Sequence, residues 1–173
     1  MKILERFFDN RAAGIFIALL LLHWIFLAYS YVALPDPLAI KFDASGAANY
    51  WVRPTQYLVI QVLISLISPI LVLLLLHLSN HFPSMLLNIH RSQYWLAMEN
   101  RAQMRAIISC YAFSLAGLMV MFGTGIHFAI LKANSIEPAF FPSRYTYALV
   151  FLFFIGVFMW SRMLNKALSV NSA

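Results

Sequence analysis

Four long apolar stretches limit what this 173-residue chain can fold into more than any other feature of its sequence. A helix needs about 20 predominantly apolar residues to cross the hydrocarbon core of a bilayer. Each stretch is that long, and none alternates apolar and polar residues as a barrel strand does. The sequence therefore predicts an all-α integral membrane protein with a single domain over residues 1–173. Its four transmembrane helices form a bundle and are expected at about residues 13–32, 57–78, 106–131 and 145–164.

The composition agrees with lipid as the main solvent of the chain. Hydrophobic residues make up 62% and charged residues 10%, whereas a soluble domain carries roughly 25% charged residues. The net charge of +6 comes from basic residues at the ends of the apolar stretches. Anionic headgroups explain that placement, so we expect a lipid bilayer and no nucleic acid as partner. Cys110, the lone cysteine, is expected to be a small core residue.

The distribution of Lys and Arg predicts the orientation. Eight of them lie in the N-terminal tail, the second loop and the C-terminal tail, and four lie in the first and third loops. The positive-inside rule then places both termini in the cytoplasm. The first stretch exceeds the roughly 7–15 apolar residues of a signal peptide, which favours an uncleaved anchor. We expect a multi-pass protein of the bacterial cytoplasmic (inner) membrane.

The first loop, from Leu34 to Gln56, is expected to be an ordered extracytoplasmic segment after the first helix. Its prolines restrict the backbone, and Asp43 to Gly46 predicts a turn that the Asp side chain caps. Three aromatics (Phe42, Tyr50 and Trp51) are expected to fold back onto the helix ends. The candidate functional surface of this loop comprises Lys41, Asp43, Tyr50, Trp51 and Arg53. The competing interpretation is that the loop only closes the bundle.

Two stretches carry a family resemblance. In the first loop the order of residues is Leu34, Pro35, Phe42, Asp43, Gly46 and Trp51. In the second loop it is Asn88, Tyr94, Trp95, Leu96, Glu99 and Arg101. Together they resemble a bacterial membrane domain of unknown function, in its short single-domain form with four helices. That domain also forms the N-terminal part of immunity proteins against the sporulation-delaying toxin of bacilli, which have further helices. The resemblance implies a contact-dependent, immunity-like role.

The second loop also has a physical interpretation of its own. Apolar and polar residues between positions 85 and 104 predict an amphipathic segment in the inner interface. It is either an interfacial elbow or a docking face on the cytoplasmic side. The candidate residues of that partner face are Tyr94, Trp95, Glu99 and Arg101.

Polar residues inside the membrane stretches form a second candidate site. His23, Gln61 and His127 are predicted to form an intramembrane cluster, because polar side chains at bilayer depth face protein or water. Ser65 and Ser68 are expected at a depth similar to that of His23, and Thr124 is expected with His127 in the outer half of the third stretch. The cluster is either a set of interhelical hydrogen bonds between neutral imidazoles or a small-molecule, proton or ion site.

The sequence favours neither a metal site nor an enzyme. His77 and His81 have metal-ligand spacing, but no acidic residue lies nearby as a third ligand. Hydrolase, phosphate-binding and dinucleotide motifs are absent from the sequence. We therefore expect no metal and no cofactor; a membrane enzyme with a histidine-bound metal is the third interpretation.

The leading expectation is a non-enzymatic membrane protein that acts through protein contacts. It would be an accessory subunit of a membrane complex or an immunity-like protective factor, with a membrane-protein partner or a second copy of itself. The alternative is a channel or transporter component that binds a small ligand or ion in the polar cavity between helices.

Overall fold

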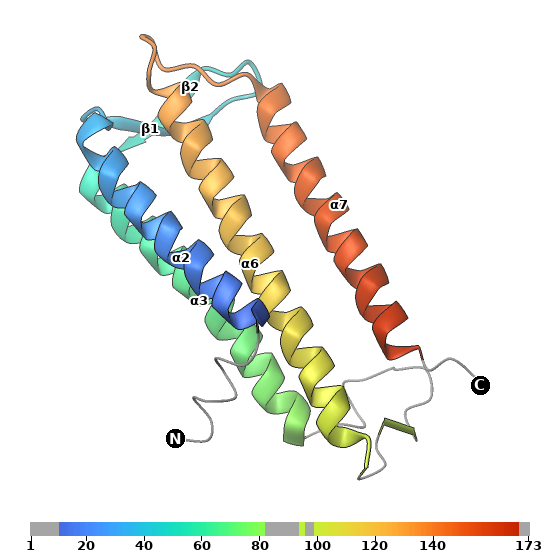
Figure 1. The fold of residues 1–173 in the computed structure, drawn as a ribbon. Coiled ribbons are helices and arrows are strands. Elements are labelled where there is room, and N and C mark those ends of the chain that lie inside the picture. The colour runs from blue at the N-terminus through green and yellow to red at the C-terminus, as the bar shows by residue number, and fades with distance from the viewer. Residues whose placement is uncertain (1–10, 82–93, 96–98, 170–173) are drawn as a thin grey trace.

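The computed structural model describes residues 11–81, 94–95 and 99–169, apart from the side chains of residues 68, 73, 75–81 and 143. Its main elements are α2 (Arg11–Ser30), α3 (Pro54–His81), α6 (Arg101–Ala133) and α7 (Ser143–Leu168), which run roughly antiparallel as long rods (Figure 1). All four are helices long and apolar enough to cross a membrane, as the sequence predicts for these stretches. They begin two to five residues before the predicted positions, because flanking polar residues continue the helices.

Helix α6 is the centre of the arrangement, and the other three helices pack against it (Figure 1). Small residues on α6 let α2 approach closely. A Cβ atom added at Gly117 would lie 3.3 Å from a methyl carbon of Leu19. The buried apolar cluster between α2, α3 and α6 consists of Ala13, Phe16, Val72, Ala112, Phe113, Ala116 and Val120.

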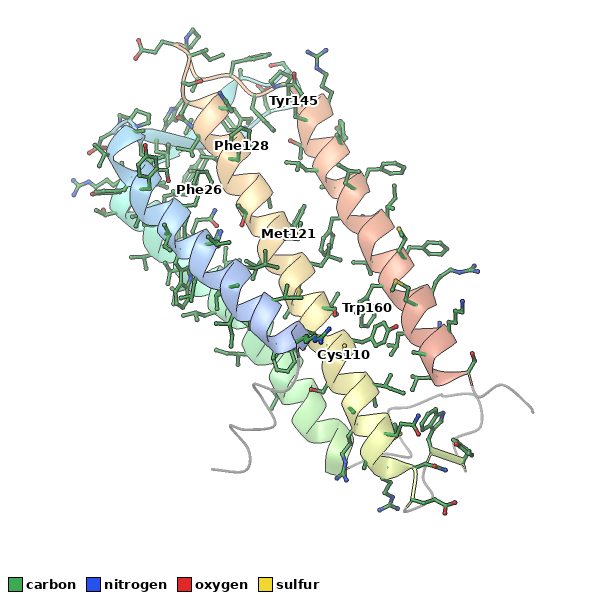
Figure 2. All side chains as sticks on the ribbon, viewed as in Figure 1. Phe26, Cys110, Met121, Phe128, Tyr145 and Trp160 are labelled. Atoms are coloured by element: carbon green, nitrogen blue, oxygen red, sulfur yellow. The ribbon has the colours of Figure 1, made fainter. Side chains whose placement is uncertain are left out.

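Helix α7 lies beside α6 and leaves most of its surface exposed (Figure 1). The Trp160 indole nitrogen donates a hydrogen bond to the Tyr111 carbonyl oxygen at 2.7 Å, and the ring points from α7 toward α6 (Figure 2). The rings of Phe122 and Phe153 contact each other in a tilted arrangement, with their centroids 4.5 Å apart. The predicted bundle is therefore a packed group of α2, α3 and α6 with α7 attached along α6. Cys110, predicted to be a core residue, is exposed on α6.

The loop after α2 is an antiparallel β-hairpin, which the all-α prediction did not include. After a short 3₁₀ turn (η1, Tyr31–Ala33), strand β1 (Leu38–Phe42) pairs with β2 (Ala48–Val52). Five-residue strands are too short to stand alone. Their stability has to come from the turn between them and from the helix ends below.

The turn of the hairpin forms where the sequence predicts it. One oxygen of Asp43, Oδ1, accepts bonds from the Ser45 nitrogen at 2.8 Å and the Ser45 hydroxyl at 2.6 Å. The backbone nitrogens of Gly46 and Ala47 also donate to it, both at 3.0 Å. Gly46 has φ +96°, and a Cβ there would lie 2.6 Å from a backbone oxygen. Only glycine fits this position without strain.

The hairpin is fixed to the end of α6 by Asn134. The Asn134 side chain accepts from the Ala39 nitrogen at 2.9 Å and donates to the Ala39 oxygen at 2.8 Å. The Phe141 nitrogen, just before α7, donates to the Gly46 oxygen at 2.9 Å. Beneath the strands lies an apolar cluster of Leu34, Leu38, Tyr57 and Ile130. The hairpin is thus attached to both α6 and the segment that leads into α7.

Candidate functional site

His127 of α6 lies at the centre of a buried hydrogen-bonded chain. The side chain is 0% exposed. Its Nδ1 atom lies 2.8 Å from the Tyr57 hydroxyl of α3, and its Nε2 atom lies 2.7 Å from the Ser30 hydroxyl of α2. The ring also stacks on Tyr57 and meets the edge of Phe26. One imidazole therefore holds three helices together.

The neighbouring hydrogen bonds show which group is the donor and which is the acceptor in each link. Ser30 donates its hydroxyl proton to the Leu27 oxygen at 3.1 Å, so it accepts from the Nε2–H of His127. His127 Nδ1 then accepts the Tyr57 hydroxyl proton. The Tyr57 oxygen in turn accepts from Gln61 Nε2 at 3.1 Å. One neutral tautomer of His127 satisfies every link.

His23 of α2 makes a separate bond to α6. Its Nδ1 atom lies 2.9 Å from the Thr124 hydroxyl. Thr124 donates its own proton to the Val120 oxygen at 2.8 Å, so His23 Nδ1–H is the donor. The second ring nitrogen of His23, Nε2, is then left with a free lone pair. The side chain as a whole is 2% exposed.

A small cavity connects His23 with Gln61. Its volume is about 20 Å³. It is lined by His23, Gln61, Ile64, Ser65, Met119, Val120 and Gly123. Ser65 accepts from the Trp24 indole nitrogen at 3.0 Å and donates to the Val62 oxygen at 2.8 Å.

The three residues predicted to cluster thus meet in one polar region. His127 and Gln61 are joined through Tyr57, and Gln61 and His23 share the cavity. Sequence reasoning missed Tyr57 and Ser30 as members of this region. Tyr57 is only 3% exposed. Helical spacing was the available signal, because Tyr57 precedes Gln61 by four positions and Ser30 follows His23 by seven.

The hairpin presents the second candidate site. Tyr50 is 50% exposed and Trp51 is 48% exposed, so they fold back less than expected. Phe42 does pack against the cluster beneath the strands. Lys41 is exposed, with its Nζ atom 5.2 Å from the centre of the Tyr50 ring. Arg53 is also exposed.

Asp43 has a structural role in this surface. The hydroxyl of Ser45 and three backbone N–H groups stabilise its carboxylate. The pKa of Asp43 therefore lies below its ordinary value, with the Ser45 hydroxyl as the largest cause. The carboxylate shapes the turn that positions Lys41 and Tyr50.

The predicted cytoplasmic partner face is described in part. Trp95 is 3% exposed, and its indole nitrogen donates to the Leu168 oxygen at 3.1 Å. It packs against Met104 and Leu168, so it joins the helix ends instead of lying on an accessible face. Tyr94, Glu99 and Arg101 are exposed. Most of the predicted amphipathic segment, namely residues 85–93 and 96–98, lies outside the described residues.

Metal ligands do not gather in the described part of the chain. Among those residues, no three His, Cys, Asp or Glu side chains lie close enough to hold an ion. The side chains of His77 and His81 lie outside the described set, so the expectation that they bind no metal stays a prediction.

Comparison of the chain with family models, with curated proteins and with solved structures gives no significant match. The class of the protein therefore follows from the fold itself. It is a mostly helical protein with four helices of membrane-spanning length and composition, consistent with a multi-pass membrane protein. The resemblance to the toxin-immunity domain stays a prediction.

Proposed function

We propose that this chain is a non-enzymatic protein of the bacterial cytoplasmic membrane that acts through protein contacts. It serves as an accessory subunit of a membrane complex or as an immunity-like protective factor. Both termini are cytoplasmic, and the β-hairpin lies on the outer side and contacts the partner. The observation that supports this proposal best is that a hairpin attached at several points presents exposed aromatic and basic side chains.

Rigid attachment favours binding because it reduces the entropy lost on association. The Asn134 side chain holds both backbone groups of Ala39, and Asp43 holds the turn with four hydrogen bonds. A loop that only closed a helix bundle would not require this many hydrogen bonds to fix its conformation. The exposed face of the hairpin is therefore held in one shape before a partner arrives.

The exposed side chains define the chemistry of the partner. Tyr, Trp and Arg are the residues that most often dominate binding energy in interfaces. Here Tyr50 and Trp51 offer apolar area, and Lys41 and Arg53 offer positive charge. The matching surface is an apolar patch with carboxylates beside it, on a membrane protein at the same side of the bilayer.

Site-specific photocrosslinking in native membranes tests this surface. A crosslinking amino acid at Tyr50 is expected to form an adduct with one protein. The same amino acid at Tyr147, 69% exposed on α7, serves as the matched control and is expected to react with lipid. Combined Lys41→Ala and Arg53→Ala changes should lower the protein adduct about tenfold, which corresponds to about 1.4 kcal/mol lost from two exposed charge pairs.

A change at the exposed Arg144, at the start of α7, tests whether the hairpin binds a protein or lipid headgroups. If the hairpin only met anionic lipid, Arg144→Ala would act like the other two changes, and position 50 would give lipid adducts alone. That result would refute the proposal. An unchanged adduct in the Lys41 and Arg53 variant would refute it as well.

The proposed orientation has its own test. With Cys110 replaced by Ala, a cysteine placed at Ser45 in the turn should react with an impermeant thiol reagent in intact cells or spheroplasts. A cysteine placed at Ser169, just after α7, should react only after lysis. The opposite pattern would mean that the hairpin faces the cytoplasm.

A second candidate function is a channel or transporter component, which the buried region of His23, Gln61 and His127 favours. The cavity holds about 20 Å³, so its ligand would have the size of a water molecule. Vesicles with the purified protein should then pass water or protons faster than protein-free vesicles, and Gln61→Leu should abolish the difference. Equal rates would exclude this function.

A further inference from the structure

We propose that the cavity between α2, α3 and α6 is a binding site for one structural water molecule. The water donates one hydrogen bond to His23 Nε2 and one to Gln61 Oε1. This inference concerns the interior of the helix group and is independent of the contact function proposed for the hairpin.

The cavity has the right size and walls for water. Its volume of about 20 Å³ exceeds the roughly 10–15 Å³ that one water molecule requires. Cavities of this size stay dry only when their walls are apolar. Here His23, Gln61 and Ser65 contribute polar atoms to the lining.

Two of these side chains have hydrogen-bonding capacity left over. His23 uses Nδ1–H on Thr124, and Gln61 uses Nε2 on Tyr57. That leaves the lone pair of His23 Nε2 and the carbonyl oxygen of Gln61, neither of which has a protein partner among the described residues. Because His23 is only 2% exposed and Gln61 only 9% exposed, few hydrogen-bond donors from outside the protein reach these two acceptors. No fully buried side-chain nitrogen or oxygen in the described part of the chain lacks a partner, so these two acceptors retain some accessible surface. Both residues line the cavity, which is therefore the space in which a donor fits.

The donors and acceptors select water over an ion. Both leftover groups are acceptors, and a water molecule supplies two O–H donors while its own oxygen can accept the second amide proton of Gln61. A hard cation prefers six or more oxygen ligands. The cavity offers one amide oxygen and a serine hydroxyl whose proton already goes to Val62. Among the described residues, no Asp or Glu side chain lines it.

With the water in place, the polar groups form one continuous chain across three helices. Its order is Thr124, His23, water, Gln61, Tyr57, His127 and Ser30. It connects α2, α3 and α6 within the parts of these helices that are apolar enough to cross a membrane.

Replacement of Gly123 by Ala tests the proposal, because the melting temperature should fall if the cavity holds water and rise if it is dry. Gly123 lines the cavity, and a Cβ atom built on it meets no side chain within 4 Å. Ala there would displace the water and leave His23 and Gln61 without a donor. The melting temperature in detergent should then fall by about 2–4 °C. In a dry cavity the added methyl group would fill a void, and the melting temperature would rise.

Gly14→Ala is the matched control, because Gly14 also lies in a membrane helix with open space around its Cβ position. It is exposed on α2, and Ala there should leave the melting temperature unchanged or raise it slightly. If Gly123→Ala raised the melting temperature as Gly14→Ala does, the proposal would fail.

Solid-state NMR of the unmodified protein in bilayers gives a second, direct measurement. Magnetisation from water protons should reach His23 Nε2 and the Gln61 side chain, and Gly123→Ala should abolish this transfer. His127 serves as internal reference, because both of its ring nitrogens already have protein partners. The absence of transfer to His23 in the unmodified protein would overturn the proposal, whatever the variants do.

Discussion

Removing the hydroxyl group of Tyr57 is the sharpest perturbation of the buried hydrogen-bonded chain. Tyr57→Phe keeps the ring, and with it the stacking on His127 and the burial beneath the hairpin. It removes two hydrogen bonds, one of 2.8 Å to His127 and one of 3.1 Å from Gln61. Side-chain hydrogen bonds between membrane helices contribute about 0.6 kcal/mol on average and reach about 1.7 kcal/mol. The loss of two such bonds should therefore lower the free energy of unfolding by about 1–3 kcal/mol.

The upper half of that range is expected, because the change leaves a buried donor and a buried acceptor behind, each costing about 1–3 kcal/mol when unsatisfied. The assay is the free energy of unfolding in lipid bicelles, measured by steric trapping. Tyr29→Phe on α2 is the matched control, since Tyr29 is 84% exposed, and it should stay within about 0.5 kcal/mol of the parent. If Tyr57→Phe also stayed within that limit, the assigned donor order around His127 would be wrong.

Three further predictions concern the hairpin. Gly46→Ala should destabilise it by at least about 1–2 kcal/mol, because φ is +96° and the new Cβ would lie 2.6 Å from a backbone oxygen; unchanged amide exchange in both strands would contradict this. Since the Ser45 hydroxyl and backbone N–H groups lower the pKa of Asp43 below 3.8, its contribution to the turn is complete above that pH and is lost as the pH falls through the lowered pKa. Protease cleavage of the hairpin should therefore rise at the acid end for the parent and stay independent of pH in Asp43→Ala. Asn134→Ala removes both bonds to Ala39 and should speed amide exchange at Ala39 roughly 30-fold, for about 2 kcal/mol of lost hydrogen bonding; exchange at the parent rate would show that Asn134 does not hold the hairpin.

The helices could be predicted from sequence because the signal is local and strong. A run of about 20 apolar residues has one stable conformation in lipid, since only a helix satisfies its own backbone. The helix ends were less accurate, because residues such as Arg101 extend α6 beyond the apolar run. The high exposure of α7, which packs along α6, could not be predicted, because apolar residues facing lipid and residues facing protein look alike in sequence.

The hairpin illustrates what local reasoning misses. The turn at Asp43 was predictable because Asp and Gly act on neighbouring backbone groups. The strands were not, since their pairing depends on Asn134, which lies 95 positions after Ala39. The same holds for the polar cluster, where residue types at similar depth were predictable but the roles of Tyr57 and Ser30 were not.

The unequal lengths of the helices have a consequence for how the molecule sits in a membrane. At about 1.5 Å per residue, the 33 residues of α6 span about 50 Å, whereas the 20 residues of α2 span about 30 Å. A hydrocarbon core is about 30 Å thick, so α2 matches it and α6 exceeds it by about 20 Å. Because the hairpin holds the neighbouring ends of both helices at one level, the surplus of α6 lies at its Arg101 end, opposite the hairpin (Figure 1). If α2 spans the hydrocarbon core, that end of α6, where Met104 packs against Trp95 and Leu168, extends beyond the core.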